Sequence, residues 1–185
     1  MRKPSFRILI FLLILFLGCR KEIGQQEFPT DSTEGKNVFG CYIDGKMLLP
    51  CRPGGVADNG SAVLQSNGWQ EGAGHFTISI AVINNCDRGF LYGHYIHVNF
   101  DSVAIATGMS YKLGSNYGTD RNKVSCLYSE DLQDFSSDPS LDGNLVVTYF
   151  DRDKRILSGK FEATLHDIHS SKTVQLTTGR FDVTF

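Results

Sequence analysis

The sequence lacks an excess of one charge sign, which is the mark of many proteins that bind nucleic acid through their surface. Eighteen Lys and Arg residues stand against twenty Asp and Glu residues, for a formal net charge of −2. A chain without a basic excess has no electrostatic footprint for a phosphate backbone. We therefore expect no nucleic-acid partner.

Long apolar runs and catalytic motifs are also missing. No run reaches the roughly eighteen apolar residues of a transmembrane helix. The chain has no G-x-S-x-G, H-E-x-x-H or C-x-x-C motif and no phosphate-binding G-x-x-x-x-G-K-[ST] loop. We therefore assign no catalytic residue and no cofactor, and we favour a non-enzymatic protein. A small hydrolase is the alternative, with its site in Arg52–Gly74 or Ser129–Gly143, two long segments without a strand pattern.

The N-terminus does carry a recognisable signal. Three cations among residues 2–7 precede a ten-residue apolar run, Ile8–Leu17. A helix of that length spans about 15 Å, half of a ~30 Å hydrocarbon core, which suits a signal peptide rather than a membrane span. Gly18 and Cys19 follow at once and resemble the lipobox of bacterial lipoproteins, in which the Cys is acylated and becomes the first residue. A plain secretory signal with a coincidental Cys is the alternative.

The leader predicts how the chain is organised and where it works. We expect a lipoprotein signal peptide at 1–18, a lipid-anchored flexible tether at 19–36 and a single β-domain at 37–185. Acyl chains such as palmitate on Cys19 would hold the protein to a membrane, because each buried CH₂ contributes about 0.8 kcal/mol and several chains act together. The expected location is the cell envelope, at the outer membrane, facing the periplasm or the outside.

The domain has the period-two apolar pattern of half-buried strands nearly throughout. In His75–Ile83, apolar residues alternate with Thr, Ser and Ala. Asp44 and Gly45 predict a tight hairpin turn, and no window has a helical period. We expect an all-β antiparallel β-sandwich, with a β-barrel as the alternative. The nine expected strands are Phe39–Ile43, Lys46–Leu49, His75–Ile83, Tyr95–Ile105, Lys123–Tyr128, Asn144–Phe150, Arg155–Leu165, Thr173–Thr177 and Arg180–Phe185.

Both ends of the domain resemble one known family. The segment Asn37–Lys46 reads N-V-F-G-C-Y-I-D-G-K, and Gly179–Val183 reads G-R-F-D-V. Together with the lipobox and the polar tether, these motifs resemble a family of uncharacterised Bacteroidota lipoproteins. The resemblance implies an envelope lipoprotein with this architecture. It implies no activity and no catalytic residue, because the shared motifs are turns and core positions.

Four cysteines remain after Cys19. An even number in an exported chain predicts up to two disulfides among Cys41, Cys51, Cys86 and Cys126. In the hairpin Cys41 should lie opposite Leu48, so that Cys51, three residues further on, points to the other face. We therefore favour a pairing of Cys41 and of Cys51 with Cys86 or Cys126. Free buried thiols acting as small apolar side chains are the alternative.

Several aromatic residues are candidates for ligand contacts. Trp69, Tyr92, Tyr111 and Tyr117 lie in or near Gly-rich stretches. Exposed aromatic rings on a β-domain can stack on sugar rings, so a glycan-binding surface module is an alternative function. A protein ligand is also compatible with this surface. The same rings could equally pack against the sheet, since Tyr and Trp tolerate partial burial.

Metal sites are not predicted. His94 and His97, like His166 and His169, are three residues apart and would face opposite sides of a regular strand. The five carboxylates between Glu130 and Asp142 lack the regular spacing of a calcium loop. We interpret that stretch as a solvated acidic loop.

Overall fold

The computed structural model describes residues 27–51, 64–71, 74–84, 93–114, 123–130, 133–167 and 169–185. These residues form strands and turns and contain no helix, which confirms the all-β class. The predicted signal peptide and four residues singled out above, Cys19, Cys86, Tyr92 and Tyr117, lie outside the described residues.

Eleven strands make up the described fold. They are β1 (Val38–Ile43), β2 (Lys46–Leu48), β3 (Leu64–Glu71), β4 (His75–Asn84), β5 (His94–Ala104), β6 (Ser110–Gly114), β7 (Lys123–Glu130), β8 (Gln133–Ser137), β9 (Gly143–Asp151), β10 (Ile156–Asp167) and β11 (Thr173–Thr184).

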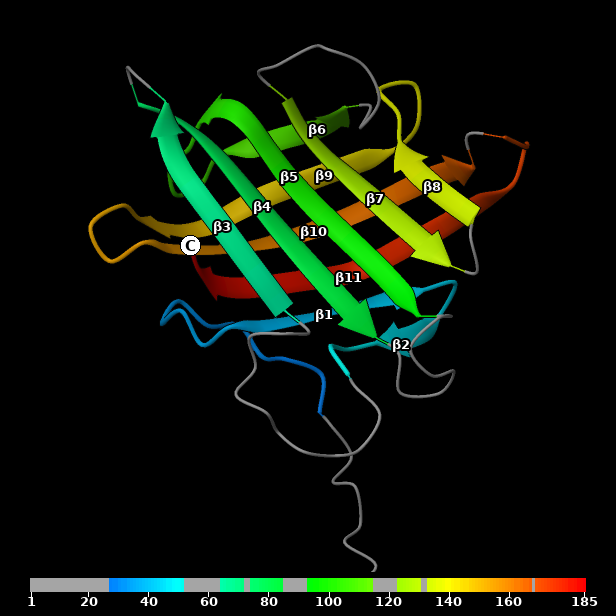
Figure 1. The fold of residues 1–185 in the computed structure, drawn as a ribbon, viewed down its shortest axis with the longest axis horizontal. Coiled ribbons are helices and arrows are strands. Elements are labelled where there is room, and N and C mark those ends of the chain that lie inside the picture. The colour runs from blue at the N-terminus through cyan, green and yellow to red at the C-terminus, as the bar shows by residue number, and fades with distance from the viewer. Residues whose placement is uncertain are drawn as a thin grey trace, which may run out of the picture.

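All the strands belong to one hydrogen-bonded sheet with the order β2-β1-β11-β10-β9-β6-β7-β5-β4-β3, and β8 pairs with both β10 and β7. The pairing of β6 with β7 is parallel and the other strand pairs are antiparallel, so the sheet is mixed rather than purely antiparallel as predicted. Figure 1 shows β3, β4, β5 and β7 crossing in front of β1, β9, β10 and β11. The sheet thus folds over itself, which is common to sandwiches and barrels.

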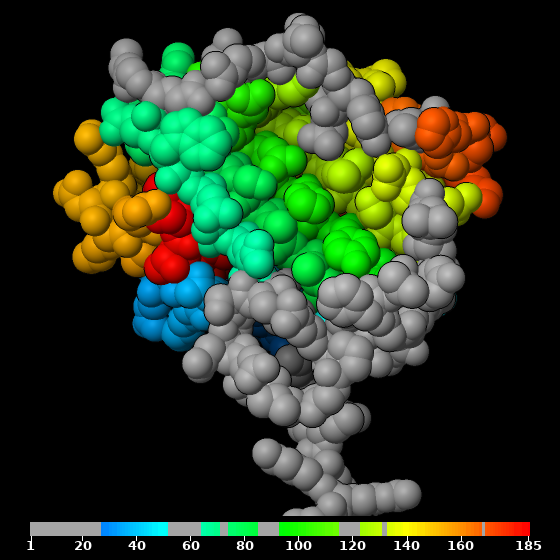
Figure 2. Space-filling model, in the orientation of Figure 1, coloured from blue at the N-terminus to red at the C-terminus, as the bar shows by residue number. Residues whose placement is uncertain are grey.

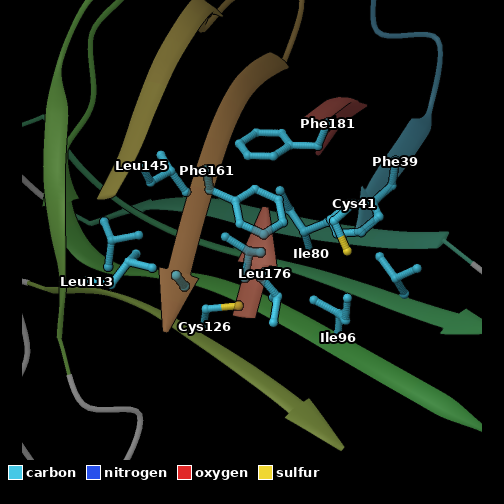
Figure 3. Close-up of a cluster of buried hydrophobic side chains, with 14 of the residues drawn as sticks. Phe39, Cys41, Ile80, Ile96, Leu113, Cys126, Leu145, Phe161, Leu176 and Phe181 are labelled. Carbon is cyan, nitrogen blue, oxygen red and sulfur yellow. The ribbon is translucent and has the colours of Figure 1, made fainter. Parts of the chain in front are cut away.

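The core lies between the front and back strands. Alternate residues of β4 and β5 point inward, as the period-two pattern predicts, and meet residues from β10 and β11. Figure 3 shows Phe161 and Phe181 among the other apolar side chains of this cluster. The ring of Phe161 lies 5.7 Å from that of Phe39 and 6.5 Å from that of Phe181.

Residues 28–36, which we call the strap, are part of the folded domain and not of a flexible tether as predicted. Asp182 of β11 accepts hydrogen bonds from the backbone N–H groups of Glu34, Gly35 and Lys36, at 3.2, 2.9 and 3.1 Å. The ring of Phe28 stacks on Tyr42 of β1 at 5.1 Å. The strap therefore lies across the outer faces of β1, β10 and β11, because these strands offer a buried carboxylate and an aromatic face.

Candidate functional site

The outer side of β3, β4, β5 and β7, which we call the front face, carries mostly neutral polar side chains. The strand register places Asn67, Ser79, Asn99 and Ser125 in one row across the four strands. The Ser79 hydroxyl donates to Asn99 Oδ1 at 2.7 Å. Figure 2 looks onto this face. Amide and hydroxyl groups of this kind can bind the hydroxyls of a neutral ligand.

Trp69 lies on the front face, in β3 and not in a turn. It is the single Trp of the chain, it pairs with Thr77 of β4, and 55% of its surface is exposed. The neighbouring Gly68 fixes this strand to the end of the chain. A Cβ atom at Gly68 would lie 2.6 Å from the Phe185 ring, and the Gly68 carbonyl accepts a 3.2 Å hydrogen bond from Arg155 Nη2. The indole is thus presented by an anchored strand.

Tyr111, another predicted ligand contact, packs against the sheet, which was the alternative role for these aromatic residues. Its hydroxyl donates to the Ala104 carbonyl at 2.5 Å, and its ring meets Phe100 edge-on at 5.9 Å. Burial raises the pKa of the Tyr111 hydroxyl. Trp69 is therefore the one candidate aromatic within the described residues that keeps a large exposed face.

The histidines of β5 lie on opposite faces, as the spacing predicts. His97 belongs to the front face between Ala81 and Leu127, and burial lowers its pKa, so the ring is neutral at pH 7. The described residues hold no group of three or more His, Cys, Asp or Glu side chains that could bind a metal ion.

His94 belongs to a cluster that sequence reasoning missed. The Tyr128 hydroxyl donates to Glu130 Oε2 at 2.9 Å and is hydrogen-bonded to His94 Nδ1 at 2.7 Å. Only 1% of Tyr128 is exposed, and its ring stacks on Phe135. The cluster joins the ends of β5 and β7 and gives the buried phenol two polar partners. No sequence pattern marks this cluster, because its residues come from two strands and become neighbours only when the register of β5 and β7 is known.

The predicted acidic loop is largely a strand hairpin. Glu130 ends β7, Asp134 lies in β8, and Asp134 accepts a 2.6 Å hydrogen bond from the Ser129 hydroxyl. Asp138 accepts from the Ser140 backbone and hydroxyl in the turn that follows. These carboxylates therefore serve local turns and pairings. The Phe135 side chain, which lies between them in the sequence, is buried and holds β8 to the core.

The disulfide prediction was wrong for two cysteines. Cys41 and Cys126 are free thiols, and both point into the core from β1 and β7 (Figure 3). Burial raises the pKa of both thiols, that of Cys126 to about 12, which leaves them protonated and inert. The alternative of small apolar residues holds here, because inward-facing positions of two sheet layers are surrounded by aliphatic and aromatic side chains.

Cys51 is disulfide-bonded, as predicted, and its partner lies outside the described residues. As expected, Cys41 pairs with Leu48 across the hairpin. The Cys51 N–H donates to the Ile83 carbonyl at 3.0 Å, which brings this segment beside the end of β4.

A second surface with charged groups lies under the strap. Lys160 of β10 and Arg180 of β11 face each other directly across the two strands. Asp31 of the strap bridges them, with Oδ2 2.6 Å from Lys160 Nζ and Oδ1 2.9 Å from Arg180 Nη1. Sequence reasoning missed this site because its two cations are twenty positions apart and its carboxylate lies in a segment that reads as a linker.

None of the protein-family models, curated proteins or solved structures compared with the chain matches it. Within the described residues, the structure contains no helix that is long and apolar enough to span a membrane.

Proposed function

We propose that this chain is a lipoprotein of the cell envelope that is anchored through acylated Cys19 and displays a non-enzymatic β-domain for binding or structural work. The observation that carries the proposal is the leader, in which a basic start, a ten-residue apolar run and Gly18-Cys19 follow one another. Its likeness to the Bacteroidota lipoprotein family supports the same function. The outer membrane is the proposed location.

The position of the strap limits how far the domain can lie from a membrane anchor at Cys19. Within the described residues, the first packing contact with the sheet is that of Phe28, and eight residues separate Phe28 from Cys19 in the sequence. Nine Cα steps reach at most about 30 Å. An anchored domain would therefore stay close to its membrane.

The anchor is tested by a Cys19→Ala variant of the full chain. We expect it to leave the membrane fraction, while a Cys41→Ala variant, which keeps the lipidation site, stays there. Mass spectrometry of the native chain should give a mature form that starts at Cys19 and carries fatty acyl groups. A mature form that starts elsewhere without acyl groups would contradict the proposal. Protease treatment of intact cells then separates the outer surface from the periplasm.

A second candidate function, binding of a neutral glycan, is favoured by Trp69. Its exposed indole lies beside the amide and hydroxyl rows of the front face. A sugar has an apolar ring face for the indole and hydroxyls for Asn67 and Asn99. A small hydrolase stays a hypothesis without an assigned residue.

Glycan binding can be followed directly, because Trp69 is the only Trp and its fluorescence reports on its surroundings. A glycan array gives the ligand, and Trp69→Ala should weaken its binding at least tenfold, or about 1.4 kcal/mol. Trp69→Phe should restore part of the affinity, and Tyr111→Phe should change nothing. Equal binding by Trp69→Ala and the native chain would rule out this use of the front face.

A further inference from the structure

The cation pair under the strap needs an anion. Lys160 and Arg180 are directly opposite residues on the outer faces of β10 and β11. Like charges in this cross-strand position repel each other. The Asp31 carboxylate relieves the repulsion by placing one oxygen on each cation. Hydrogen bonding from Lys160 lowers the pKa of Asp31, with a further contribution from the charge of Arg180, so the bridging group is a carboxylate anion.

The bridge sits where two cavities meet. One has a volume of about 360 Å³ and lies between the strap and the sheet, and the other has about 310 Å³ and lies over β9, β10 and β11. Lys160 and Arg180 line both. The second cavity also has Asn144, Glu162 and Thr178 in its wall, which are able to hydrogen-bond hydroxyl groups. Ligand sites typically begin at about 300 Å³.

Asp31 can leave without unfolding the strap. Its side chain is 61% exposed, against 47% for Lys160 and 31% for Arg180. The later part of the strap is held separately, because Asp182 binds the backbone of residues 34–36. The earlier part is held by Asp31, by Phe28, whose ring lies 5.8 Å from the Arg180 guanidinium, and by the Pro29 carbonyl, which accepts a 3.5 Å hydrogen bond from Arg180 Nη1.

We propose that the Lys160–Arg180 pair is a binding site for a small carboxylate ligand with a hydroxylated body, such as an acidic sugar, and that Asp31 occupies it when the ligand is absent. The carboxylate replaces Asp31 between the two cations. The hydroxylated body lies in the second cavity against Asn144 and Thr178. Binding releases residues 28–33 from the sheet, while residues 34–36 stay on Asp182. This site does not depend on the acylation of Cys19 or on the front face.

Asp31 is tethered, so it competes with a ligand at an effective concentration in the millimolar range. Removal of its charge should therefore strengthen binding. We expect the purified full chain to bind D-glucuronate weakly, and Asp31→Asn to bind it about tenfold more tightly. Lys160→Gln, which leaves one cation in place, should weaken binding at least tenfold. Its melting temperature, measured alongside, shows whether the variant is folded.

The experiment titrates D-glucuronate, glucose and inorganic phosphate in parallel by calorimetry, and follows backbone amide exchange. Glucuronate binding with faster exchange in residues 28–33 and unchanged exchange in 34–36 supports the proposal. Equal binding of glucose would show that the carboxylate is not recognised. Tighter binding of phosphate than of glucuronate would show that the site recognises phosphate and would contradict a carboxylate ligand. An unchanged glucuronate affinity in Asp31→Asn would rule out competition by the strap. If Lys160→Gln is unfolded, Arg180→Gln is measured in its place, and full affinity in a folded variant overturns the site.

Discussion

Asp182 is the residue that fastens the strap to the sheet. Only 2% of it is exposed, and it accepts hydrogen bonds from three strap N–H groups and from the Ser158 hydroxyl at 2.8 Å. Burial raises the pKa of this carboxyl, but the hydrogen bonds from the strap and Ser158 outweigh burial and leave the pKa below its ordinary value. The folded chain therefore favours the charged form of the Asp182 carboxyl.

Asp182→Asn should lower the free energy of unfolding by about 1–3 kcal/mol, because buried donors lose a charged acceptor. The pKa of Asp182 is lower in the folded chain than in the unfolded chain, so its contribution is present above pH ~4 and is lost as the pH falls through the folded value. The stability difference between the native chain and the variant should shrink in acid. Urea unfolding at several pH values measures it, and a difference that grows in acid would refute this role.

The buried thiols give a second prediction at the residue scale. Burial raises the pKa of Cys126 to about 12, so almost no thiolate exists at pH 8. We expect iodoacetamide to modify Cys41 and Cys126 only after denaturation. Peptide mapping by mass spectrometry gives the extent at each cysteine. Rapid modification of Cys126 in the native chain would mean that β7 opens readily.

At the scale of elements, β10 and β11 are joined through two glycine–phenylalanine pairs. Gly159 lies opposite Phe181, and Phe161 lies opposite Gly179. Each ring covers the neighbouring glycine, so that a Cβ atom at Gly179 would come within 2.5 Å of Phe161 Cε1. Because glycine has no side chain, each aromatic ring packs directly against the backbone of the partner strand.

Gly179→Ala should therefore destabilise the domain by about 1–3 kcal/mol, the usual result of overpacking a core. Gly114→Ala is the matched control. Its new Cβ would lie 3.5 Å from Lys123, an ordinary contact distance, and Gly114 has no unusual backbone angle. Urea unfolding curves compare the two. Equal stability of both variants would mean that the Phe161 ring shifts without penalty.

The strands that could be predicted are those whose buried faces are apolar. The alternation in His75–Ile83 identified β4, and the Asp44-Gly45 turn identified the β1–β2 hairpin with its register. In β3 the inward positions include Ser66 and Gly68, so the pattern was too polar to identify a strand. In β11, Thr178 has a positive φ of 54°, and the bulge beside it made one strand read as two.

The candidate sites were harder to predict than the strands. Trp69 stood out as the single Trp, but its placement on a strand depends on the pairing of β3 with β4. The Asp31 bridge joins residues more than a hundred positions apart, and no local pattern marks such a contact. Cys41 and Cys126 are buried because the sheet folds over itself and encloses them. The sequence pattern did not show how the sheet folds, since it was compatible with a sandwich and with a barrel.

At the scale of the whole molecule, the strap is the segment through which an N-terminal anchor would transmit force to the sheet. Deletion of residues 28–36 should lower the melting temperature by several degrees, because it exposes Asp182 and Tyr42 and leaves Lys160 and Arg180 without a counter-ion. Deletion of residues 20–26, of similar length, is the control. Differential scanning calorimetry measures both, and equal melting temperatures would show that the strap does not contribute to stability.

The two edge strands of the described sheet, β2 and β3, influence whether copies of the chain aggregate through their sheet edges. At one edge β2 has only three residues. At the other, β3 exposes three amide side chains, Gln65, Asn67 and Gln70, beside the single large apolar group Trp69, and the Gly68 carbonyl accepts a hydrogen bond from Arg155. Long, flat, apolar edges are the ones that recruit further chains into fibrils. Many copies gathered on one membrane surface should therefore stay as separate molecules instead of aggregating edge to edge.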